Sequence, residues 1–174
     1  MEKIILKTPT SAYAAQIWNY KQDFHNRKEN LAGCGTLEKS TSVEQWLNNV
    51  RMFSNVDTCP AGYVPSSLYL AIRESDDTLV GMIDIRHHIN HPILSTWGGH
   101  IGYSVISSQR GKGYAKEMLR LSLQICKQRG IDKVLITCDE NNIASRKTIL
   151  ANGGIYEKTI PVEGKMTERY WINL

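Results

Sequence analysis

The segment Ser107–Leu119, SSQRGKGYAKEML, combines a loosened backbone with positive charge at the point where a helix is expected to begin. Glycine tolerates the positive φ angles that turn successive backbone N–H groups to one side. The first N–H groups of a helix lack intrahelical partners and lie at the positive end of its dipole. Such a turn binds a phosphate or pyrophosphate mainly through the main chain, and Arg110 and Lys112 add positive charge.

Two well-known nucleotide loops do not fit this segment. A P-loop requires G-x-x-x-x-G-K-[ST], whereas Gly113 is followed by Tyr114. The dinucleotide fingerprint G-x-G-x-x-G fails at its third glycine, where Lys116 stands, and antiparallel-looking strands precede it. A nucleotide-binding enzyme is therefore the weakest of the alternatives considered.

The elements around the segment are those that would hold an anion at a helix start. The strand-like run HIGYSVI (100–106) precedes it, and an amphipathic helix with one apolar face is expected from about residue 113 to residue 129. A compact strand, KVLITC (133–138), follows, and then a short helix over 142–150 with Asn142 as a candidate N-cap.

The rest of the chain supplies strands and helices of an ordinary domain. We expect a strand in MEKIILK, a helix over 11–30 with Ser11 as N-cap, and a second helix from Ser42, whose spacing to Gln45 has the capping-box form. Strands follow at 67–74 and 78–89, joined by a hairpin turn at 75–78, then a loop over 90–99, and two last strands lie near 155–162 and 167–173. The order β-α-α-β-β-β-α-β-α-β-β without a linker predicts one mixed α/β domain over residues 1–174.

Arg110, Gly113 and Ala115 fit the pattern [RQ]-x-x-G-x-[GA]. With this motif and its element order over nearly the whole chain, the sequence resembles the GNAT superfamily of acetyl-CoA-dependent N-acyltransferases. The resemblance implies a twisted, mostly antiparallel sheet whose fourth and fifth strands splay apart, with acetyl-CoA in the gap. It implies pyrophosphate contacts from residues 110–115: Arg110, Gly111, Lys112, Gly113, Tyr114 and Ala115.

The same resemblance implies further cofactor contacts along the gap. The pantetheine would pair with the strand backbone from Tyr103 to Val105, as an extended peptide adds to a sheet edge, and the Val105 N–H would polarise the thioester carbonyl. Asn142 and Ser145 would also contact the cofactor.

Catalytic side chains are less clear, because the chain departs from the family at two positions. Many members carry a glutamate near the start of strand 4, where this chain has Gly99 and His100, and a tyrosine seven residues after the asparagine, where it has Ile149. We expect His100 to act as the base, since histidine titrates near neutral pH. Tyr103 is the candidate proton donor, with Tyr114 as an alternative.

The acceptor side carries no motif. Asp84, in the third sheet strand, could pair with His100 or receive the substrate cation, and Trp97, in the loop before strand 4, could form an apolar wall. Polyamine, aminoglycoside, amino acid, peptide N-terminus and lysine stay open as the amine that is acetylated. A catalytically silent acyl-CoA-binding sensor is the second hypothesis, because both usual catalytic residues are missing.

Composition excludes several other classes. The net charge is +4 and the pI about 8.9, but the basic residues are scattered, so we expect no nucleic-acid partner. No apolar run approaches the roughly 18 residues of a membrane span, so no membrane partner is expected. Whether two copies form a homodimer stays open.

The cysteines and histidines give two further expectations. The four cysteines form no C-x-x-C pair and the chain opens without a signal peptide, which predicts a cytoplasmic protein. His87 and His91 have a zinc-like spacing only if they lie on a helix, and Pro92 with the strand pattern before it argues against that, so no metal is expected.

Overall fold

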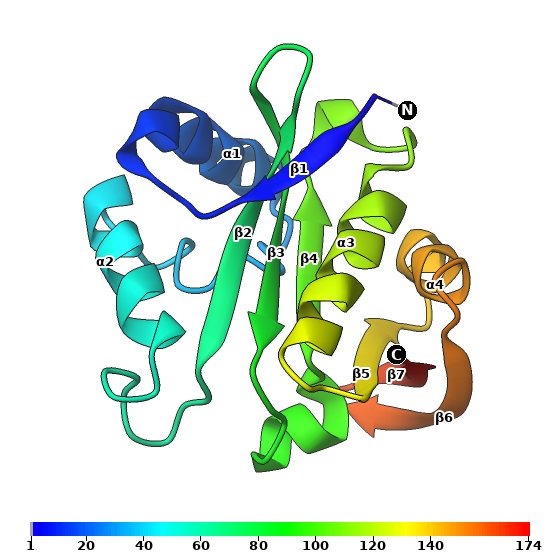
Figure 1. Cartoon of the computed structure of the whole chain (residues 1–174). Helices are drawn as coiled ribbons and strands as arrows, with labels where there is room; N and C mark the ends of the chain where they lie inside the picture. Colours follow the sequence, from blue (N-terminus) through cyan, green and yellow to red (C-terminus); the bar gives the residue numbers. More distant parts are fainter. Residues whose placement is uncertain (1) are drawn as a thin grey trace.

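The computed structural model describes residues 2–174, which form two sheets flanked by four α-helices (Figure 1). The strands are β1 (Ile4–Lys7), β2 (Ser66–Arg73), β3 (Thr78–Arg86), β4 (Ile101–Val105), β5 (Lys133–Asp139), β6 (Ile155–Val162) and β7 (Lys165–Asn173). The helices are α1 (Ala14–Arg27), α2 (Val43–Ser54), α3 (Tyr114–Gln128) and α4 (Ile143–Leu150). Short 3-10 turns cover Ser11–Tyr13 and Ser107–Gln109, and a π-helical turn covers Leu94–Gly98.

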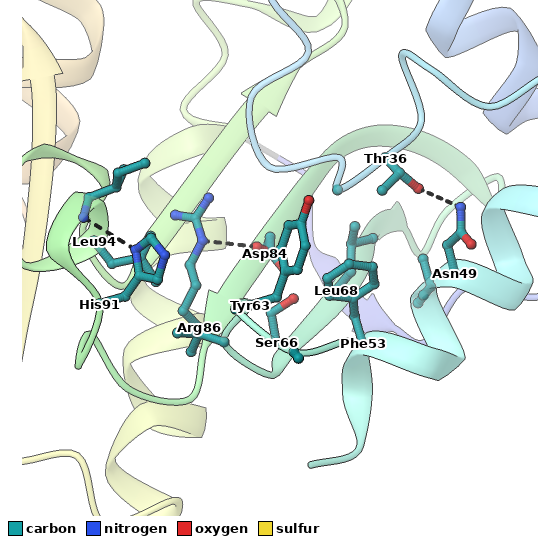
Figure 2. A pocket seen from close by; sticks show the side chains of 16 residues that line it. Thr36, Asn49, Phe53, Tyr63, Ser66, Leu68, Asp84, Arg86, His91 and Leu94 are labelled. Carbon is teal, nitrogen blue, oxygen red and sulfur yellow. Dashed lines mark hydrogen bonds and ion pairs between the residues drawn. The ribbon is translucent and has the colours of Figure 1, made fainter. Parts of the chain in front are cut away.

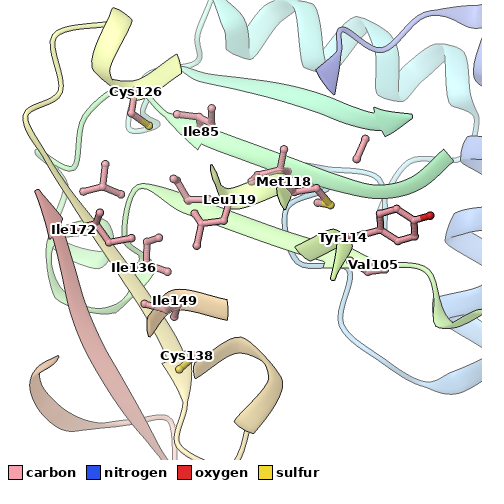
Figure 3. Close-up of a cluster of buried hydrophobic side chains, with 14 of the residues drawn as sticks. Ile85, Val105, Tyr114, Met118, Leu119, Cys126, Ile136, Cys138, Ile149 and Ile172 are labelled. Carbon is pink, nitrogen blue, oxygen red and sulfur yellow. The ribbon is translucent and has the colours of Figure 1, made fainter. Parts of the chain in front are cut away.

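The strands form an antiparallel sheet in the order β1-β2-β3-β4 and a second antiparallel sheet in the order β5-β7-β6. Helices α1 and α2 lie on one side of the first sheet and α3 on the other (Figure 1). The core under α3 joins both sheets, and its buried side chains include Met118, Leu119 and Ile136 (Figure 3). A second core lies under α1 and α2 around Trp46 and Leu70. The predicted mixed α/β class, with a mostly antiparallel sheet and flanking helices, is confirmed.

Local sequence explains where several elements begin and end. At the start of α2, the Ser42 hydroxyl accepts a hydrogen bond from the Gln45 N–H (3.1 Å), as the capping box predicts. The Gln45 side chain returns to the N–H of Thr41 (2.7 Å) and not to that of Ser42. Helix α3 ends before Gly130, whose φ of 77° suits a residue without a side chain.

The first helix differs from its prediction. The turn at Ser11–Tyr13 is a 3-10 turn whose N-cap is Thr10, without a side-chain cap bond, so Ser11 as N-cap was wrong. Helix α1 ends at Arg27 because Lys28 takes the left-handed conformation (φ 55°). The loop predicted over 90–99 contains the π-helical turn. Within residues 2–174, no helix has both the length and the apolar character needed to cross a membrane.

Strands β4 and β5 meet at one point and belong to different sheets. The His100 N–H donates to the Leu135 carbonyl (2.8 Å), and the Leu135 N–H donates to Nδ1 of the His100 ring (2.9 Å). Gly99 permits this approach, since its φ is 67° and a Cβ there would lie 2.7 Å from the Leu135 carbonyl oxygen. We call the gap between β4 and β5 beyond this contact the fork.

Candidate active site

The edge of β4 presents main-chain groups to the fork that do not bond to β3, and of those at Tyr103 and Val105 only the Val105 carbonyl has a partner within residues 2–174, the Arg110 side chain. The Ile106 N–H donates to Val80 (3.1 Å), and the His100 carbonyl accepts from Arg86 (2.8 Å), so even-numbered residues of β4 bond to β3. Because alternate residues of an antiparallel strand bond to the same neighbour, Tyr103 and Val105 direct their N–H and C=O groups to the other side. An extended chain can therefore pair with this edge.

Just beyond the open end of β4, residues 110–115 form a turn that we call the cradle. Gly111 and Gly113 both have positive φ angles, 74° and 87°, and Gly113 is the N-cap of α3. The backbone N–H groups of Gly111, Lys112 and Gly113 make no hydrogen bond within the described chain. Free N–H groups at a helix start suit an anion, as the motif predicts.

Not every residue of the cradle offers its side chain to a ligand. The Arg110 guanidinium donates to the Val105 carbonyl (2.9 Å) and to Glu29 (2.5 Å), and it lies over the Phe24 ring. Arg110 therefore ties the end of β4 to α1 and the loop after it. Tyr114 is buried in the core, whereas Lys112 is exposed and its ammonium group donates to the Gln109 side chain (2.9 Å).

A pair of hydroxyl groups closes the α4 side of the fork. The Tyr103 hydroxyl lies 2.8 Å from Ser145 Oγ, although the two residues are 42 positions apart. Asn142 caps α4, because its side chain accepts the Ser145 N–H (3.1 Å). Burial raises the pKa of Tyr103 to about 12, so its hydroxyl keeps its proton at neutral pH.

His100 lies at the closed end of the fork with its ring buried. Only 5% of the residue is exposed, and its Nδ1 is engaged by the Leu135 N–H. Burial lowers the pKa of His100 to about 4, so the ring is neutral at pH 7 and a weak proton acceptor. Its contacts join β4 to β5, a role that the sequence did not suggest.

The opposite face of the first sheet holds a cavity of about 570 Å³ (Figure 2). It lies between α2, the loops on either side of α2, the adjoining ends of β2 and β3, and the loop before β4. Its lining includes Asp84, whose Oδ2 lies 3.1 Å from Nε of Arg86. The structure therefore places Asp84 in a cavity on the side of β4 away from α3.

The apolar wall of this cavity comes from residues other than the one predicted. Trp97 is not among the lining residues, and its carbonyl accepts a hydrogen bond from Thr137 on β5 (2.5 Å). The same loop contributes His91, Ile93 and Leu94 instead. Phe53 and Tyr63 pack edge to face with ring centroids 5.3 Å apart, and nothing in the sequence spacing connects them.

Two further features bear on the chemistry of the site. Ile149, at the position where many GNAT enzymes carry a tyrosine, is fully buried in the core (Figure 3). In the described part of the chain, no group of three or more His, Cys, Asp or Glu side chains is placed to hold a metal ion.

The sequence matches the family of acetyltransferase (GNAT) domains over residues 3–155. The chain therefore belongs to the GNAT acetyltransferases, and the resemblance inferred from the motif is confirmed. A search of curated protein sequences finds no significant match.

Solved structures agree in fold over nearly the whole chain. The ribosomal-protein-S5-alanine acetyltransferase from Vibrio fischeri superposes with a TM-score of 0.73 at 15% identity, covering 99% of this chain and 94% of that one. RimJ from Mycobacterium smegmatis, solved in complex with a CoA disulfide, has a TM-score of 0.71 at 18% identity, with coverages of 98% and 81%. The microcin C7 self-immunity acetyltransferase MccE, solved with acetyl-CoA and AMP, has a TM-score of 0.69 at 14% identity, with coverages of 100% and 94%.

Proposed function

We propose that this protein transfers an acetyl group from acetyl-CoA to a primary amine at the fork between β4 and β5. The observation that carries the proposal is the arrangement around β4. Its free edge faces the fork, the cradle lies at its open end, and the cavity lies on the face opposite α3. A donor and an acceptor can thus reach one strand from opposite faces.

In the proposed complex, the CoA pyrophosphate binds the free N–H groups of residues 111–113. The pantetheine amides pair with the gap-facing groups of Tyr103 and Val105, and the Val105 N–H donates to the thioester carbonyl. The CoA-bound and acetyl-CoA-bound GNAT structures named above support this choice of donor.

The reaction proposed is direct attack. The amine, which first loses its ammonium proton to solvent, forms a bond to the thioester carbonyl carbon, and the carbon–sulfur bond breaks to release the CoA thiolate. The attacking nitrogen then gives up one proton, which restores the proton that the Tyr103–Ser145 pair donates. The Tyr103–Ser145 hydroxyl pair supplies a proton to the thiolate, because it is protonated at neutral pH and lies beside the fork. His100 holds the two strands together, and we do not assign it the role of base.

The experiment is a measurement of free CoA released from acetyl-CoA with a panel of amines, beside calorimetric binding of acetyl-CoA. We expect binding and amine-dependent CoA release. Binding without release for any amine would favour the alternative, a silent acyl-CoA sensor, which the missing glutamate and tyrosine suggest. Absence of acetyl-CoA binding would overturn both.

A further inference from the structure

The cavity beside Asp84 is largely apolar. Its lining includes Val50, Phe53, Val64, Leu68 and Leu94, and it carries a single carboxylate. Its two other hydrogen-bonding side chains near α2 satisfy each other, since Asn49 donates to the Thr36 hydroxyl (3.0 Å). The other polar groups of the lining are Ser66, Arg86, His91 and the Tyr63 hydroxyl.

Asp84 differs from the other polar residues of the lining because it is buried and has an acceptor oxygen without a partner. The residue is 5% exposed, and its Oδ1 is the one buried side-chain oxygen or nitrogen of the described residues that lacks a hydrogen-bond partner. Its Oδ2 faces Arg86, so the pair is neutral while Oδ1 can still accept a hydrogen bond. A buried acceptor without a partner is costly, and a ligand donor in the cavity would satisfy it.

Asp84 also lies close to the proposed reaction centre. It is paired in register with Gly102 of β4, so both side-chain positions are on the same face and about 5 Å apart. The Gly33 backbone nitrogen and Arg86 Nη2 cover Gly102, at 3.2 Å and 3.4 Å from where a Cβ would be. Asp84 is therefore one strand away from the fork, although no residue of β4 itself lines the cavity.

The mouth of the cavity is apolar as well. Tyr63 and Ile93 line it and are 66% and 47% exposed. Exposed apolar side chains around an opening are typical of a site that receives an apolar group. A volume of about 570 Å³ is within the range of small-ligand sites, and exceeds the needs of one amino group.

We infer that the acceptor is a primary amine attached to an apolar body, such as an α-amino group next to a large hydrophobic or aromatic side chain. This inference rests on the proposed function. The amino group donates to Asp84 Oδ1, and the apolar body packs against Phe53 and Tyr63. A polyamine or aminoglycoside carries several positive charges and would meet only one carboxylate, already paired with Arg86.

The test is a comparison of kcat/KM for phenylalaninamide and leucinamide with that for serinamide and spermidine, at saturating acetyl-CoA. We expect a preference of about tenfold or more for the apolar amines, the scale of discrimination by apolar contacts. Equal or better use of serinamide or spermidine would overturn the inference and leave the proposed function intact. Phe-Gly-Gly in the same panel tests whether the acceptor amine is the N-terminus of a peptide or belongs to a small molecule.

Single substitutions in the lining test whether this cavity determines the preference for apolar amines. We expect Asp84→Asn to raise the KM for phenylalaninamide at least about tenfold while the KM for acetyl-CoA stays unchanged, on the scale of a lost charged hydrogen bond. Tyr63→Ala, at an exposed position that folding tolerates, should reduce the preference for phenylalaninamide over serinamide. Val56→Ala is the control, because Val56 is 73% exposed and lies outside the lining. No change in either cavity variant would contradict the site.

Thermal stabilisation by the amine, measured without turnover, tests the cavity independently of the proposed acetyl transfer. With CoA present, phenylalaninamide should raise the Tm of the wild type more than that of Asp84→Asn, because a ligand that binds only the folded state stabilises it. If acetyl-CoA binds and no amine is acetylated, but this shift is seen, the proposed function fails and the inference about the cavity stands. An equal shift in both proteins would overturn the inference.

Discussion

The proposed donor site and the cavity lie on opposite faces of the first sheet, and they differ in how their residues are distributed along the chain. On the α3 face, the proposed donor site uses main-chain groups from one continuous stretch, 101–115. On the α1–α2 face, the cavity collects side chains from segments between Gly35 and Leu94 that come together only in the folded chain. A main-chain site needs only a local conformation, so a short motif encodes it, whereas a side-chain site has no such local signal.

The largest expected effect is on the donor half. Gly113→Val should weaken acetyl-CoA binding at least about 100-fold, because a β-branched residue is strained at a φ of 87° and its side chain would block the close approach of the pyrophosphate. Calorimetric titration with acetyl-CoA measures the change. Amine binding in the cavity should stay as in the wild type.

Gly130→Val is the matched control for this variant. Gly130 lies at the other end of α3, also with a positive φ (77°), and a Cβ there would meet nothing within 4 Å. We expect a similar loss of stability without a loss of acetyl-CoA affinity. Equal affinities for Gly113→Val and the wild type would remove the cradle from the donor site.

The next effect is on the chemical step. Tyr103→Phe should lower kcat at least about tenfold with little change in the KM for acetyl-CoA, since it removes a positioned proton donor. Tyr170→Phe is the control: burial raises the pKa of that hydroxyl to about 12 as well, but it lies on β7 and donates to Glu168 of the same strand. If kcat falls by the same factor in the two variants, or falls in neither, the Tyr103–Ser145 pair is not the proton source.

The smallest expected effect on activity is at His100, where stability is the sharper readout. The pKa of the buried ring is about 4, below its unfolded value of about 6.5, so the unfolded chain binds more protons between these values. Stability is therefore full above pH 6.5 and falls as the pH drops toward 4, with an upper bound of about 3 kcal/mol for this ring. His87, whose pKa burial also lowers to about 4, is present in both proteins and cancels in a comparison.

His100→Ala tests this assignment. Denaturant unfolding at pH 7 and pH 4.5 should show a smaller fall in stability for the variant than for the wild type. At pH 7 the variant should already be less stable by about 1–3 kcal/mol, because the Leu135 N–H loses its acceptor. Its pH–rate profile should keep the wild-type shape; a lost limb near neutral pH would restore His100 as the base.

The sequence predicted most of the local structure and part of the site. Helix α3, the hairpin before β3 and the Ser42 cap are local features, and period, turn residues and spacing were enough to find them. Asp84 could be singled out because it is the one charged residue inside the run 79–85 of the third sheet strand. The first helix failed because the left-handed turn at Lys28 has no signal in the residue type.

What could not be predicted depends on distant contacts. Arg110 was expected to add charge to the cradle, but Glu29, 81 residues earlier, engages it. Tyr103 and Ser145 meet across the fork, and Phe53 meets Tyr63 across a loop, in pairs that no periodicity relates. The sequence led us to expect His100 as a base and gave no sign of its Leu135 contact, which arises only when β5 packs beside β4.

The most direct measurement of the central claim is a crystal structure of the protein with CoA and phenylalaninamide. We predict pyrophosphate oxygens within hydrogen-bond distance of the N–H groups of residues 111–113, the pantetheine along Tyr103–Val105, and the amine on the opposite face beside Asp84. CoA bound in the α1–α2 cavity, or both ligands on one face of β4, would contradict the claim that donor and acceptor meet from opposite faces.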